Sequence, residues 1–335
     1  MFGVCLAALV LSILLAVAIG SVTIPPRAIA ELMLSRLTLF RLSADYPETY
    51  TTILFKLRLP RVALMALIGA ALAAAGTAYQ GLFRNPLADP YLVGVASGAG
   101  FGATLVITFG LPATGLGLMA VPLGAFLGGV LAVALVVMIA QVGRTTPVTT
   151  MLLAGVAIGS FATAITTFWM LRSPDGLRRA FNWLLGGYAG GGWLPVWIVL
   201  PYLLLGLIAL QWNARALNVL QLDEEQARQL GLNVDRLKLT IVGAATLMTA
   251  AAVAFGGLIG FAGLVVPHIL RILGGPDYRR LVPLSAVGGA AFLILADLIA
   301  RTVFAPQELP VGVITALIGA PFFVFLLRRI KRSVF

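Results

Sequence analysis

The sequence predicts an all-α, polytopic integral membrane protein with about ten transmembrane helices. Of its 335 residues, 60% are hydrophobic and only 10% are charged, and the mean hydropathy is +1.03. Soluble globular proteins carry about 25% charged residues, so this chain has too few to cover a water-facing surface. Apolar runs that approach the roughly 20 residues of a spanning helix follow one another along the chain. We therefore expect a single transmembrane domain over residues 1–335.

Ten apolar segments are bounded by charged residues, Pro or Gly, as expected for transmembrane helices. The eighth is short and rich in glycine, which predicts a broken or partly re-entrant segment. The segments cover residues 4–22, 62–82, 92–110, 119–141, 148–171, 193–211, 239–256, 258–273, 282–300 and 311–327.

The first segment has two interpretations, a retained helix or a secretory leader. Ala16-Val17-Ala18 has the small residues of a signal-peptidase site. The residues before it contain no Lys or Arg, which a leader would normally carry. We therefore expect a retained first helix.

The net charge of +11 raises the question of nucleic-acid binding. The basic residues are scattered between apolar segments, which favours anchoring at the membrane surface instead. An even number of helices places both termini on one side. The basic cluster at residues 328–332 predicts that this side is the cytoplasm of a bacterial or archaeal cell. The single cysteine, Cys5, excludes an intrachain disulfide and a cysteine metal cluster.

Small residues spaced four apart predict close helix packing, because they let two backbones approach each other. Some such pairs will arise by chance in a chain with 37 glycines. The pairs are Gly98/Gly102, Gly124/Gly128, Gly155/Gly159 and Gly256/Gly260.

The segment between the sixth and seventh apolar runs, residues 213–238, holds four of the twelve acidic residues of the chain. Asp223 is a good N-cap for a short helix that Gly231 would end. Asn233 would cap a second short helix. The pattern fits either an ordinary solvated loop or a rigid elbow that docks into a soluble partner.

Two further polar features lie at membrane boundaries. The stretch 82–90 contains two prolines and two charged residues, which predicts irregular backbone, either in a tight turn or at a constriction of a translocation path. Asp297 and Arg301 are spaced i, i+4 in the ninth segment, as in an intrahelical ion pair.

Several catalytic and nucleotide-binding motifs are absent from the sequence. It contains no phosphate-binding loop, no His-Glu-x-x-His zinc motif and no serine elbow, so we expect a protein that is not an enzyme. An ion-coupled carrier would need carboxylates along its pathway, and only Asp89 and Asp297 are candidates. This scarcity of carboxylates favours a transporter that is driven by other subunits. An ATP-independent channel or secondary carrier is the alternative.

Three stretches of the chain resemble the FecCD-type permeases, the membrane subunits of type II ABC importers for iron–siderophores, haem and cobalamin. Together they span nearly the whole chain in the family's order. They are Leu57-Arg58-Leu59-Pro60-Arg61 through Asn85-Pro86-Leu87-Ala88-Asp89-Pro90 to Ser97-Gly98-Ala99; Leu220 through Glu224 and Ala227 to Leu230-Gly231; and Gly260 through Pro267-His268 and Arg271 to Gly275-Pro276-Asp277 and Glu308-Leu309-Pro310.

The resemblance implies a homodimer, or a heterodimer with a related permease, that works with two ATPase subunits and one periplasmic or lipid-anchored binding protein. ATP and Mg would be bound by the ATPase, and this chain would bind no cofactor. Siderophore, haem and corrinoid all stay open as substrates, because selection in such systems is largely made by the binding protein.

The resemblance also implies three groups of site residues. Leu222-Asp223-Glu224 departs from the Leu-Gly-acid pattern of the family, so Asp223 carries over less firmly than its neighbours. The groups are ATPase coupling, Asp223, Glu224, Glu225, Gln226, Ala227, Leu230 and Gly231; binding-protein docking, Arg58, Arg61 and Arg301; and a cytoplasmic gate, Asn85, Leu87, Thr145 and Thr146.

Overall fold

The computed structural model describes residues 1–20, 22, 24–36, 46–110, 117–143, 145–187 and 191–334. Over these ranges the chain is a helical bundle, and no β-sheet occurs in them. The helices are α1 (Phe2–Ala18), α2 (Pro26–Arg36), α3 (Glu48–Thr52), the π-helical turn η1 (Ile53–Arg58), α4 (Leu59–Leu82), the 3₁₀ turn η2 (Pro90–Val93), α5 (Val95–Thr108), α6 (Gly117–Ala140), α7 (Val148–Arg172), α8 (Pro174–Leu184), α9 (Leu194–Trp212), α10 (Ala214–Leu220), α11 (Glu224–Gln229), α12 (Val234–Gly256), α13 (Ala262–Gly274), α14 (Tyr278–Thr302) and α15 (Val311–Val334).

The all-α membrane fold predicted from composition is confirmed. Within the described ranges, six helices are long and apolar enough to cross a bilayer, and four shorter apolar helices occupy the remaining predicted segments. The basic cluster at 328–332 falls in α15, although side chains from residue 329 onward lie outside the described part. The eighth segment is shorter than predicted but is not broken internally: residues 257–260 are not helical, and α13 then continues without interruption from Ala262 to Gly274.

Several element boundaries predicted from the sequence were wrong. The second segment is much longer than 62–82, because helix continues without a break from Glu48 to Leu82 through the charged residues of η1. Asn233 caps no separate short helix but the long helix α12. The short helices α2, α8 and α10 were missed, since they are too polar or too short to give an apolar run.

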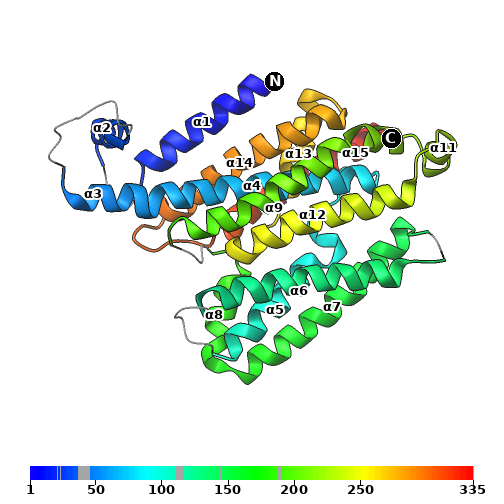
Figure 1. The fold of residues 1–335 in the computed structure, drawn as a ribbon, viewed down its shortest axis with the longest axis horizontal. Coiled ribbons are helices and arrows are strands. Elements are labelled where there is room, and N and C mark those ends of the chain that lie inside the picture. The colour runs from blue at the N-terminus through cyan, green and yellow to red at the C-terminus, as the bar shows by residue number, and fades with distance from the viewer. Residues whose placement is uncertain are drawn as a thin grey trace.

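Helix α4 lies at the centre of the bundle. It packs against α14, α12, α13 and α9, and every residue from Ile68 to Leu82 is buried. Helices α5 to α8 form a second group below these helices in Figure 1, joined to the first group through contacts between α6 and α12. Helix α4 is therefore the element that contacts most of the first group.

Glycines bring several helix backbones into direct contact. Gly98 and Gly102 of α5 pack on Gly128 and Gly124 of α6, as two predicted pairs require. Gly155 packs against the backbone of Leu92. The pair Gly256/Gly260 does not serve this purpose, because Gly256 faces side chains and Gly260 faces open space.

Two glycine contacts were not predicted, Gly69 of α4 with Gly289 of α14 and Gly76 of α4 with Gly263 of α13. Each joins single glycines that are far apart in the sequence, so no spacing rule could indicate them. A Cβ atom at Gly76 would lie much closer than 3.0 Å to the carbonyl oxygen of Gly263. Only glycine therefore permits this approach of α4 to α13.

The break between α12 and α13 is stabilised by a tyrosine from another segment. Gly257 and Phe261 adopt left-handed backbone conformations, with φ of 67° and 66°. The Tyr91 hydroxyl donates to the carbonyl oxygen of Ile259 (3.0 Å) and accepts from its N–H (3.1 Å). One side chain thus satisfies both backbone groups of a residue that cannot pair within a helix, as irregular backbone in a membrane protein requires.

Replacement of Tyr91 by phenylalanine should leave both backbone groups of Ile259 without this partner. We expect a cost of about 1–3 kcal/mol, the usual penalty of an unsatisfied buried polar group, measured as a lower apparent melting temperature in detergent. Tyr202→Phe is the control, since the Tyr202 hydroxyl makes no hydrogen bond within the described residues. Equal shifts for the two variants would show that the Tyr91 contact contributes nothing specific.

Candidate coupling face and arginine cluster

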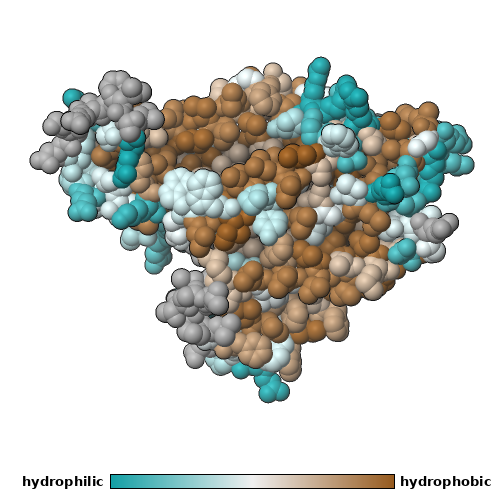
Figure 2. Space-filling view, in the orientation of Figure 1, coloured by the Kyte–Doolittle hydropathy of each residue, from teal (hydrophilic) through white to brown (hydrophobic). Residues whose placement is uncertain are grey.

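The surface divides into an apolar band and two polar ends. In Figure 2 hydrophilic residues gather near α2 and α3 at one end and near α10, α11 and the α13–α14 turn at the other, with a largely brown surface between them. This is the distribution of a protein that spans a bilayer. The predicted coupling residues lie at one polar end and the predicted docking arginines lie near the other.

Helix α11 projects from the bundle at the edge of the molecule (Figure 1). The Asp223 carboxylate caps it by accepting from the N–H of Glu225 at 3.2 Å, and Gly231 ends the turn after it with φ of 84°. The predicted helix, its cap and its stop are therefore confirmed, although Asp223 replaces the glycine that is frequent in the family pattern.

The outer side of α11 combines acidic and apolar residues. Ala227 is buried against the bundle, whereas Glu225 and Gln226 are exposed. Leu222 and Leu230 flank the helix and are 60% and 67% exposed. Exposed acidic, amide and leucine side chains therefore lie together on the outer side of α11.

A buried lysine joins α11 to two other elements. Lys238 of α12 is 1% exposed, and its Nζ donates to the Glu224 carboxylate at 2.7 Å and to the carbonyl oxygen of Thr146 at 3.0 Å. The N–H of Thr146 in turn donates to Asp235 at 3.2 Å, and Asp235 pairs with Arg228 of α11 at 2.8 Å. The start of α7, the start of α12 and α11 therefore form one hydrogen-bonded unit.

Helix α10 is attached to the ends of α4 and α14. Gln221 donates to the carbonyl oxygen of Gly81 at 2.9 Å. Asn218 donates to Asp277 at 2.6 Å and accepts from the N–H of Tyr278 at 2.9 Å. Hydrogen bonds from Arg279 and Asn218 hold the pKa of Asp277 well below its usual range, so this carboxylate stays ionised at physiological pH.

A second layer of polar contacts lies behind α10. The Tyr278 hydroxyl accepts from the Arg271 guanidinium at 2.9 Å, and the same guanidinium donates to the Gln80 side chain at 3.3 Å. Gln80, Arg271, Asp277 and the segment 220–231 come from the three stretches that carry the family resemblance. The fold brings these stretches together at one end of the bundle.

The stretch 82–90 is a tight irregular turn, which is the first of the two interpretations offered by the sequence. Arg84 has φ of 49°, and the Asn85 side chain accepts from the N–H of Leu87 at 2.9 Å. Arg84 lies 3.9 Å from Asp223, which places the turn beside the coupling segment. Across the described residues no hydrogen bond connects this turn with Thr145 or Thr146, so the assignment of a shared gate stays a prediction.

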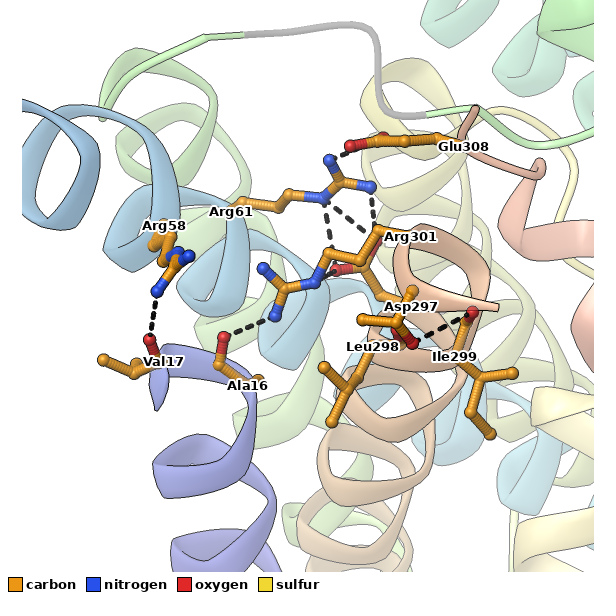
Figure 3. Close-up of polar contacts among 10 residues, drawn as sticks. Ala16, Val17, Arg58, Arg61, Asp297, Leu298, Ile299, Arg301 and Glu308 are labelled. Atoms are coloured by element: carbon orange, nitrogen blue, oxygen red, sulfur yellow. Dashed lines mark hydrogen bonds and ion pairs between the residues drawn. The ribbon is translucent and has the colours of Figure 1, made fainter. Parts of the chain in front are cut away.

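The three predicted docking arginines, hereafter the arginine cluster, gather at the other end (Figure 3). Arg58 donates to the carbonyl oxygens of Val17 at 2.9 Å and of Val22, and Arg301 donates to the carbonyl oxygen of Ala16. These carbonyls lie at or beyond the C-terminal end of α1, where they lack helical partners and where the helix dipole favours cations. The contacts attach the end of α1 to α14 and to the start of α4.

Arg61 makes the acidic contacts of the cluster. It pairs with Asp297 and with Glu308, each at 2.8 Å. The expected i, i+4 pair of Asp297 with Arg301 exists at 3.6 Å, but Arg61 is the closer partner. A pocket of about 300 Å³ opens on the three arginines and Glu308. Within it Arg58 and Arg301 are only 5% and 7% exposed, whereas the Glu308 side chain is 52% exposed.

Sequence reasoning grouped the three arginines but missed their intramolecular partners. Only the i, i+4 spacing of Asp297 and Arg301 was visible in the sequence. The carbonyls of α1 carry no signal, because any residue type supplies a carbonyl oxygen.

The fold and the two polar ends define the class of protein, a multi-pass permease with a projecting helical elbow. The profile of the FecCD transport family matches residues 8–329. The chain belongs to this family and is the membrane-spanning permease of an ABC transporter.

Several permeases are similar to this chain over most of its length. It is 43% identical to the ABC transporter permease YvrB of Bacillus subtilis, over 97% of this chain and 92% of that one. It is 47% identical to the cobalamin import permease BtuC of Halobacterium salinarum, over 84% and 75%. It is 40% identical to the hemin transport permease HmuU of Yersinia pestis, over 95% and 94%.

The fold also matches a solved structure, an inward-facing conformation of a metal-chelate type ABC transporter. The TM-score is 0.85 at 28% identity, and the match covers 98% of each chain.

Proposed function

We propose that this permease imports a bulky metal chelate, an iron–siderophore, haem or cobalamin, across the inner or plasma membrane of a prokaryotic cell. Two copies would enclose the pathway, two ATPase subunits would bind ATP and Mg on the cytoplasmic side, and a binding protein would deliver the substrate from outside. Related permeases named for cobalamin and hemin, and a neighbour named for metal chelates, support this substrate class.

The observation that carries the proposal is the attachment of α11 to the bundle. A partner that displaces α11 displaces Lys238 and Thr146, and through α10 it displaces the ends of α4 and α14. The close glycine contacts of α4 then move α13 and α14 with it. Such packed elements shift between discrete arrangements, which would alternate access to the pathway without covalent chemistry in this chain.

On this proposal the end that carries α11 faces the cytoplasm. The C-terminus and α11 lie toward the same end of the molecule (Figure 1), in agreement with the basic cluster at residues 328–332 and the positive-inside rule. Because α1 starts on the side toward α11 and runs to the arginine cluster, the N-terminus would share this side.

The proposal is tested by purification of the tagged chain from its native membrane in a mild detergent, followed by reconstitution in liposomes with whatever co-purifies. We expect an ATPase at one copy per permease and ATP-dependent uptake of one of the three chelates. Recovery of the chain alone, with uptake that needs no ATP, would instead establish an unassisted channel or carrier.

The arginine cluster makes a sign-specific prediction for docking of the binding protein through its carboxylates. Arg61→Gln should weaken docking. Glu308→Ala should strengthen docking, because it removes a half-exposed carboxylate that competes with the binding protein for Arg61. The gain should be up to about fivefold, which corresponds to the free energy of one surface ion pair. Docking affinity is measured by calorimetry at low salt, with Glu31→Ala as the control at the same end. Weaker docking of Glu308→Ala would contradict this role of the pocket.

A further inference from the structure

An apolar groove of about 710 Å³ lies between α9 and α14 on the outer surface of the bundle. Figure 2 shows this face as largely apolar. All but two of the lining residues are aliphatic or proline, so the groove is suited to a hydrocarbon chain. The lining residues are Leu207, Ile208, Gln211, Trp212, Val282, Pro283, Ala286 and Val287.

The groove ends at a group of arginines. Arg279 and Arg280 are exposed in the first turn of α14, and they precede the groove residue Pro283 by four and three positions, so they lie about one helical turn beyond it. Arg215 is exposed at the start of α10, three residues after Trp212. Gln211 donates to the carbonyl oxygen of Arg279 at 3.0 Å, which holds the ends of the two helices together at this mouth.

The mouth of the groove has an excess of positive charge. Arg279 pairs with Asp277 at 2.9 Å. Within the described ranges Arg215 and Arg280 have no ionic partner. The three arginines therefore have one carboxylate partner among them, and Arg215 and Arg280 are available to an anion from outside the chain.

Trp212 marks the depth at which the groove meets the membrane surface. Its side chain, at the end of α9, is 86% exposed. Tryptophan concentrates at the level of the lipid head groups, where its ring is apolar and its N–H can bond to water or phosphate. The apolar groove thus lies at acyl-chain depth and the arginines lie at head-group depth.

We propose that this groove is a binding site for an anionic glycerophospholipid such as phosphatidylglycerol. An acyl chain occupies the groove between α9 and α14, and the phosphate lies between Arg215 and Arg280. Basic sites at the ends of transmembrane helices recognise anionic head groups in this way. The bound lipid braces α9 and α10 against α14, at the end of the bundle that carries the coupling segment.

The test is native mass spectrometry of the purified permease titrated with dioleoyl phosphatidylglycerol and, separately, with dioleoyl phosphatidylcholine. The acyl chains are identical, so only the head group differs. We expect tighter binding of phosphatidylglycerol. The double variant Arg215→Gln with Arg280→Gln should weaken phosphatidylglycerol binding by roughly 25-fold. Each arginine near the membrane surface is expected to contribute about fivefold to the affinity for an anionic lipid. Binding of phosphatidylcholine should not change.

A matched control removes two exposed arginines of α8, with Arg178→Gln and Arg179→Gln, and should change phosphatidylglycerol binding by less than about twofold. Equal affinity for the two lipids, or equal loss in both double variants, would overturn the proposal. The same spectra report oligomer mass. If Arg215→Gln with Arg280→Gln dissociates a dimer without releasing lipid, this face binds a second copy and the lipid assignment is wrong.

Discussion

Gly76→Ala should remove most of the folded permease. The added Cβ would overlap the carbonyl of Gly263 in α13, and neither backbone can yield without displacing buried neighbours of α4. Overpacking of a well-packed interior costs about 1–3 kcal/mol, and more where the obstacle is backbone. We expect a loss of more than about 3 kcal/mol, seen as an apparent melting temperature lowered by roughly 10 °C and as reduced accumulation in the membrane.

The control for Gly76 is Gly243→Ala in α12. Gly243 lies within a helix, and a Cβ there meets no atom within 4 Å, so alanine should be neutral or slightly stabilising through its higher helix propensity. If Gly76→Ala melts like Gly243→Ala, the α4–α13 contact is not limiting. Helix α4 would then not be the element that positions α13.

Lys238→Met should separate ATP hydrolysis from transport. Methionine keeps the length of the buried stem but loses the contacts with Glu224 and Thr146 that join α11 to α12 and to the start of α7. Each 1.36 kcal/mol of lost coupling free energy lowers a rate tenfold. We expect transport in liposomes to fall by about tenfold or more, while the ATPase subunits continue to hydrolyse ATP.

Two further variants separate coupling from simple instability. Arg236→Met removes an exposed cation from the first turn of the same helix and should transport normally. Glu224→Gln should reproduce part of the Lys238→Met defect, and it should add nothing to Lys238→Met, because that variant already lacks the contact with Glu224 as well as the one with Thr146. Additive losses would show that Lys238 acts elsewhere than through Glu224.

Local chemistry explains which features could be predicted from the sequence. The apolar runs, the Asp223 cap and the Gly231 stop each depend on residues within one turn of one another. Helices α2, α8 and α10 could not be found from hydropathy, because short or polar helices in a membrane protein gain stability from tertiary contacts.

Long-range pairing explains what the sequence could not show. From the sequence, Lys238 would be expected on the surface at the start of a helix. In the fold it is only 1% exposed, and it donates to the carbonyl oxygen of a residue 92 positions away. The same holds for Tyr91 with Ile259 and for Gly76 with Gly263. The arginine cluster was grouped correctly through resemblance, but its contacts with α1 and Glu308 appear only in three dimensions.

The most direct test of the coupling account is site-specific photo-crosslinking from α11 in intact membranes. A benzoylphenylalanine at Gln226, exposed on α11, should form an adduct with the ATPase subunit whose yield changes when ATP is added. The same group at Leu57, exposed at the opposite end of the bundle, should form none with the ATPase. Absence of an ATPase adduct at Gln226, in membranes that still transport, would contradict the assignment of α11 as the element that receives ATP-driven motion.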